Sequence, residues 1–110
     1  MRYSIDGSVY RLTRITGPTH NLLGLGFGHE SGGRIIIERL AGPSGPAIDE
    51  GLLEQAVLSG VEAANDALGT DYRPTRIQYV PSDTPDPGIY QNLARVIVER
   101  LASGVDYASD

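Results

Sequence analysis

The sequence predicts an α+β fold in which two helices cover one face of a mostly antiparallel sheet. Several segments in the first half of the 110-residue chain are β-rich or alternate apolar residues with other residues, as strands with one buried face do. Two later segments carry apolar residues at three- and four-residue spacing, as amphipathic helices do. One further strand lies between them. The predicted order is β-β-β-α-β-α with an additional N-terminal hairpin strand, arranged as a two-layer sandwich.

The chain begins with a predicted β-hairpin. Residues 2–5 and 8–15 are β-rich, and Asp6-Gly7 separates them. An Asp-Gly pair between two such segments is the strongest short-range hairpin signal. A turn is expected at Gly17-Pro18-Thr19, before the next strand.

That next strand, residues 22–28, alternates leucine or phenylalanine with glycine, so one of its faces carries no side chains. A dinucleotide-binding loop needs Gly-x-Gly-x-x-Gly between a strand and a helix, whereas here the third glycine position is His29 and a strand follows. We therefore expect a strand that lets another group pack close or tolerates a bulge. Residues 29–33 have the length of a hairpin loop and lead to an isoleucine-rich strand at 34–40.

A long helix is predicted after the short Gly- and Pro-rich linker 41–46. Asp49 is placed to cap its first turn, and Gly69 is placed to end it. A stripe of small residues runs beside the apolar stripe and predicts close packing on the sheet or on the second helix, with a seam between two copies as the alternative. The small residues are Ala56, Gly60, Ala63 and Ala67.

The last strand and the last helix are predicted at residues 75–80 and from Pro87 onward. Asp86 followed by Pro87 is a good N-cap and first-turn pair, and Gly104 is a natural end. Residues on the apolar faces of the predicted strands and helices are expected in the core. They include Leu25, Leu53, Val57, Val61, Ile77, Leu93 and Ile97.

Composition limits the function classes. The length suits one domain spanning residues 1–110, and the absence of cysteine excludes disulfides and thiolate chemistry. No apolar run approaches the length of a membrane span, so we expect a cytoplasmic protein without a membrane partner. All nine basic residues are arginine, and the net charge of −5 disfavours extensive non-specific nucleic-acid binding.

No catalytic constellation is evident. His20 and His29 bracket the glycine-rich strand, and about nine residues of extended chain separate them by close to 30 Å, too far to share one ion. Hydroxyl and carboxylate side chains adjoin one another within residues 82–86 without a positioned base, and turn formation explains them. We therefore assign no catalytic, cofactor-binding or metal-binding residue, expect no cofactor, and keep a small enzyme only as a third alternative.

Two stretches carry a resemblance to a known family. The first is Glu-Gln-Ala-Val-Leu-Ser-Gly-Val at residues 54–61. The second is residues 79–101, where a strand ending in aromatic-x-Pro passes through Thr84-Pro85 into a helix with Val-Ile-Val-Glu-Arg-Leu at 96–101. From about residue 19 to its end, the chain resembles the fourth domain of translational GTPases of the elongation factor G class, most closely that of tetracycline-resistance ribosomal protection proteins. The resemblance implies the ribosomal protein S5 domain 2-like fold.

In that family this domain enters the ribosomal decoding site, and the loop corresponding to residues 81–88 is one of its contacting tips. No Gly-x-x-x-x-Gly-Lys-Ser/Thr motif occurs and lysine is absent, so GTP hydrolysis is not carried over. What the resemblance implies is a non-enzymatic, translation-factor-like module associated with the ribosome, RNA or a ribosome-associated protein.

The expected partner contact is the loop 81–88 together with the loop 29–33, which we expect beside it. Two aspartates make the first loop acidic, so RNA affinity is expected to be weak. A protein-interaction or self-associating module, including a homodimer, is the alternative reading. The candidate contact residues are His29, Arg34, Arg76, Ser82, Asp83 and Thr84.

Overall fold

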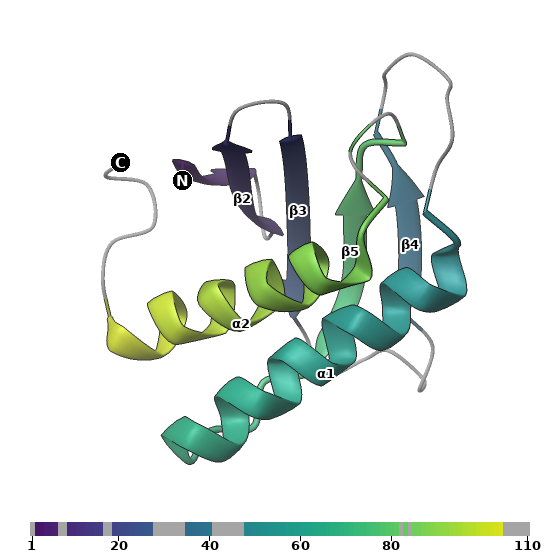
Figure 1. Ribbon diagram of the computed structural model, residues 1–110. Coiled ribbons are helices and arrows are strands. Elements are labelled where there is room, and N and C mark those ends of the chain that lie inside the picture. Colours follow the sequence, from purple (N-terminus) through teal and green to yellow (C-terminus); the bar gives the residue numbers. More distant parts are fainter. Residues whose placement is uncertain are drawn as a thin grey trace.

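A mostly antiparallel five-stranded sheet and two helices make up the fold, as predicted (Figure 1). Both helices lie on the same face of the sheet, so the second layer is helical (Figure 1). The computed structural model describes residues 2–6, 9–16, 19–27, 35–40, 48–81, 83 and 85–104. The elements are β1 (Arg2–Asp6), β2 (Val9–Thr16), β3 (Thr19–Phe27), β4 (Ile36–Arg39), α1 (Glu50–Leu68), β5 (Pro74–Tyr79) and α2 (Pro87–Ser103).

The N-terminal hairpin is confirmed. β1 and β2 pair antiparallel, and Asp6 faces Val9 across the two connecting residues. β3 begins earlier than the sequence suggested, because β2 continues to Thr16, which pairs with Thr19. Thr19 therefore belongs to the strand rather than to the predicted turn.

The predicted hairpin between the strands now labelled β3 and β4 is wrong. The order in the sheet is β1-β2-β3-β5-β4, so β5 lies between them, antiparallel to β3 and parallel to β4. The reason is burial. Ile77 and Tyr79 on one face of β5 are fully buried, and Gln78 on the other face is 9% exposed. A strand buried on both faces is most stable in the interior of the sheet, where both of its edges are paired.

The connection from β4 through α1 to β5 is left-handed. Seen from the helix side, β4 and β5 both run upward, α1 passes in front, and β5 lies to the left of β4 (Figure 1). Most connections between parallel strands are right-handed. A right-handed one would have placed β5 beyond the outer side of β4, so the rare hand is what lets β5 pair with both neighbours.

Both helices begin and end where the sequence predicts. The Asp49 carboxylate accepts hydrogen bonds from two first-turn amides of α1, and the Asp86 carboxylate accepts one in α2. Gly69 and Gly104 end the helices in the left-handed region, with φ of 68° and 77°. Side-chain capping and a positive-φ glycine satisfy backbone groups that the helix leaves without partners.

The core lies between the sheet and the helices. α2 packs on β2 and β3, while α1 packs on α2 and β5. All seven residues predicted for the core are at most 3% exposed. α1 and α2 are in close contact at Gly60, where an added Cβ would overlap the carbonyl oxygen of Gln91. The small-residue stripe thus serves packing between the two helices at Gly60, whereas Ala63 and Ala67 are exposed.

Candidate functional site

The face of the sheet opposite the helices is the candidate site. The strand register aligns one row of side chains across all five strands. In the described part of the chain, no helix covers this face (Figure 1). We call it the uncovered sheet face. Its central row is Ser4, Arg11, Gly24, Gln78 and Glu38.

Hydrogen bonds join this row into a network. The Arg11 guanidinium donates to Gln78 Oε1 from Nε at 3.1 Å and from Nη2 at 2.9 Å. Gln78 Nε2 donates to Glu38 Oε1 at 2.9 Å, and Arg76 Nη1 lies 2.7 Å from the same oxygen. Four side chains from β2, β5 and β4 therefore form one connected layer, which holds the two arginines in place.

Gly24 makes this network possible. Arg11 belongs to β2 and Gln78 to β5, so their hydrogen bonds pass over β3. A Cβ at Gly24 would lie 3.0 Å from Val9 Cγ1 and 3.1 Å from Gln78 Oε1, closer than real Cβ contacts normally come. The strand with a bare face was predicted to allow close packing or a bulge. Both are found, since the β3–β5 register shifts between Gly26 and Phe27.

The charges on this face are more positive than those of the rest of the chain. Arg2, Arg11 and Arg76 belong to it by register, against Glu38 among the described side chains. The Gln78 hydrogen bond, followed by the Arg76 ion pair, lowers the pKa of Glu38, so this carboxylate is ionised at neutral pH. α1, in the other layer, carries no basic residue. It carries four acidic residues, which are Glu50, Glu54, Glu62 and Asp66.

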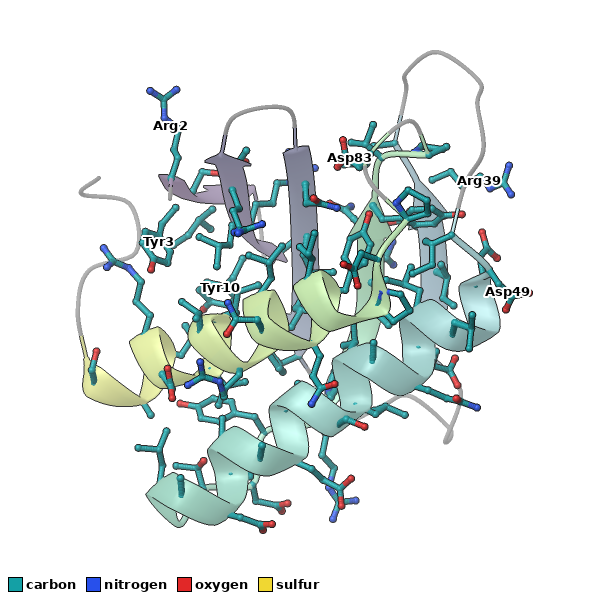
Figure 2. All side chains as sticks on the ribbon, in the orientation of Figure 1. Arg2, Tyr3, Tyr10, Arg39, Asp49 and Asp83 are labelled. Carbon is teal, nitrogen blue, oxygen red and sulfur yellow. The ribbon has the colours of Figure 1, made fainter. Side chains whose placement is uncertain are left out.

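The predicted contact residues fall in different places. Arg76 lies on the uncovered sheet face in its ion pair with Glu38. Asp83 is only 6% exposed, and its Oδ2 accepts a hydrogen bond of 2.7 Å from the Leu22 amide. Figure 2 shows it beside the end of β5. The Asp83 carboxylate therefore anchors its loop to β3. Four further residues, His29, Arg34, Ser82 and Thr84, lie outside the described residues.

The strands that lead into the two predicted contact loops terminate at opposite ends of the sheet. Phe27, where β3 ends, pairs with Pro74, the first residue of β5, whereas Leu23 pairs with Tyr79, the last. The connection after β3 and the connection after β5 therefore start at opposite ends of the sheet. The expectation of one contact surface formed by loops 29–33 and 81–88 rested on a β3–β4 hairpin, which the strand order contradicts, and residues 29–33 themselves lie outside the described residues.

One polar cluster was missed by sequence reasoning. Tyr79 Oη donates to Glu50 Oε2 at 2.7 Å, and Arg39 Nε donates to the same carboxylate oxygen at 3.2 Å and to Tyr79 Oη at 3.1 Å. Burial, followed by the Glu50 hydrogen bond, raises the pKa of Tyr79, so the phenol stays a donor. The cluster fastens the first turn of α1 to the ends of β4 and β5. No local pattern signals it, because its members are far apart in the sequence.

The described residues contain no group of three or more metal-ligating side chains, and none of their helices has the length and apolarity to cross a membrane. A shallow hollow between α1 and α2 is lined by small residues, amides and Arg95, without a carboxylate or a histidine. Comparison of the chain with known protein families, characterised proteins and solved structures finds no match.

Proposed function

We propose that this protein is a non-enzymatic, translation-factor-like module that contacts ribosomal RNA through the uncovered sheet face. One observation carries the proposal: Arg2, Arg11 and Arg76 share one uncovered face of a chain whose net charge is −5. The resemblance of residues 54–61 and 79–101 to elongation factor G domain IV supports the class of module. The acidic α1 lies in the other layer, so an RNA approaching the arginines does not meet it.

The chemistry of the face suits phosphates rather than bases. The aromatic side chains of the sheet belong by register to the helix side, so they are not placed for base stacking. Arginine guanidiniums bind phosphate oxygens without reading the sequence. With three arginines the binding is weak and salt-dependent, and the slope of log K against log salt is roughly −2 to −3.

The test is co-sedimentation of the purified protein with ribosomes over a salt series. Arg76→Gln should weaken binding and flatten the salt slope by about one unit, because one phosphate contact is lost. Arg73→Gln is the matched control. Arg73 precedes β5, and its weak ion pair with Asp71 is exposed, at 3.6 Å. Equal losses in the two variants, or wild-type protein that stays in the supernatant at low salt, contradict the proposal.

A protein-interaction module is the second candidate. Leu52 and Leu68 on the acidic helix α1 are 50% and 45% exposed, which leaves apolar surface available to a protein partner. Two results together favour this candidate. The purified protein does not bind ribosomes at low salt, and substitution of these leucines abolishes binding to a protein partner.

A further inference from the structure

β4 forms one edge of the sheet and exposes an isoleucine there. It pairs with β5 on one side and is last in the strand order. Its start lies within three consecutive isoleucines, Ile35 to Ile37, and Ile36 is 51% exposed on the uncovered sheet face. An edge strand presents a row of backbone donors and acceptors that can pair with another strand.

The hydrogen-bond pattern shows which backbone groups face outward. The Leu40 amide donates to the Tyr79 carbonyl oxygen at 2.8 Å, so the even-numbered residues of β4 bond to β5. In a strand the groups of alternate residues point to opposite sides. The N–H and C=O groups of Ile35, Ile37 and Arg39 therefore point away from the sheet, and together they provide both donors and acceptors.

The other edge differs. β1 places Arg2 and Ser4 on the same face of the sheet. A charged side chain on an edge strand, such as that of Arg2, discourages edge-to-edge pairing. Ile36 occupies the comparable place on β4. Of the two edges of the described sheet, β4 is thus the one that exposes a large apolar side chain on the uncovered sheet face.

We propose that two copies of this chain pair antiparallel through β4, around a two-fold axis at Ile36, to form one continuous ten-stranded sheet. This inference does not depend on the proposed function. In this register Ile36 faces Ile36 of the second copy, and Ile35 faces Ile37 twice. A register centred on Ile37 would place Ile36 opposite Glu38, and one centred on Glu38 would oppose like charges, both of which are less favourable.

A two-fold pairing of this kind closes at two copies, since each edge is used once. The paired segment is short, so the buried area falls below that of a standard stable interface and a dissociation constant on the order of micromolar is expected. The uncovered faces of both copies would then lie on the same side of one sheet.

Disulfide cross-linking tests the register, because the chain has no cysteine and one substitution introduces one thiol. Facing residues that do not exchange hydrogen bonds have Cα atoms about 4.5 Å apart, within the disulfide range of roughly 4.4–6.8 Å. Ile36→Cys should therefore form a linked dimer under mild oxidation. Glu38→Cys should do so at least about tenfold more slowly, because the two thiols would be offset by about 13 Å along the strands.

Ser4→Cys is the matched control on the other edge, on the same face of the sheet. Cross-linking of Ile36→Cys that is no faster than that of Ser4→Cys overturns the proposal. Faster cross-linking of Ile37→Cys than of Ile36→Cys overturns the register centred on Ile36.

Sedimentation velocity on the wild-type chain supplies the second test. Near 100 micromolar, well above a micromolar dissociation constant, the mass should approach twice 11.8 kDa. Ile36→Glu should lower the measured mass to that of one chain, because two carboxylates would meet on the two-fold axis. Leu52→Glu is the control, since the side chain of Leu52 is 50% exposed and that of Ile36 is 51% exposed. The Leu52→Glu variant should remain dimeric. A monomeric wild-type protein, or a dimeric Ile36→Glu variant, contradicts the proposal.

Discussion

Buried polar side chains join Asp83 and helix α2 to β3. Asp83 accepts a hydrogen bond from the Leu22 amide, and Asn21, fully buried on β3, forms a side-chain hydrogen bond with Tyr90 of α2. Burial raises the pKa of Tyr90 to about 12. The Asn21 hydrogen bond lowers it and the nearby Asp83 carboxylate raises it. These residues act together because a buried polar group is costly unless it is hydrogen-bonded.

Ionisation of Tyr90 therefore lowers the free energy of unfolding at alkaline pH. Its pKa is raised above the usual value near 10, so its contribution is complete below about pH 10 and is lost as the pH rises toward 12. The loss is on the order of 2–3 kcal/mol. Tyr90→Phe should lose less stability than the wild type between pH 9 and about pH 11.5 in urea unfolding. An equal loss in both proteins would show that Tyr90 does not titrate in this way.

At the scale of elements, the contact between α1 and α2 depends on Gly60. Its position against the Gln91 carbonyl oxygen leaves no room for a side chain, and the blocking atom is backbone. On the uncovered sheet face, Gly24 plays a similar part, because it lets Arg11 reach Gln78 across β3. In both places a glycine allows two elements to approach each other.

Gly60→Ala should be destabilising although alanine favours helices. The Cβ must push α2 away from α1, and overpacking of this kind costs about 1–3 kcal/mol or more. Thermal unfolding measures the effect. Ser59→Ala, at the exposed neighbouring position of the same helix, is the control and should stay close to wild type. Equal melting temperatures for the two variants would refute the close contact at Gly60.

At the scale of the whole molecule, the two layers differ in charge. α1 carries four acidic residues and no basic one, whereas the described side chains of the uncovered sheet face include three arginines and Glu38. At physiological salt, electrostatic interactions are screened beyond about 8–10 Å. Charges in one layer therefore have little effect on a partner bound to the other layer. The position of a charge therefore matters more than the net value of −5.

Glu38→Gln should strengthen ribosome binding, because it removes the carboxylate that pairs with Arg76 and leaves an amide in its place. Glu62→Gln changes the net charge by the same amount on α1 and should have a smaller effect. Co-sedimentation at one low salt concentration compares them. If both substitutions raise the affinity equally, only the net charge matters, and the uncovered sheet face is not the contact.

The sequence by itself determined the fold class, both helices with their caps, and the hairpin at Asp6. It also determined the seven predicted core residues, of which Leu25 is the first and Ile97 the last. These features depend on interactions between residues close together in the chain, or on burial, which periodicity predicts. The bare face of the glycine-rich strand also followed from alternation alone.

Only the tertiary structure decided that β5 lies between β3 and β4, and therefore that Arg11, Gln78 and Glu38 meet on one face. The same holds for the cluster of Arg39, Glu50 and Tyr79. Local patterns favour a hairpin between β3 and β4, because these strands are consecutive in the chain. The observed strand order instead reflects the burial of β5 on both faces. Such contacts join residues up to 67 positions apart, and no short segment encodes them.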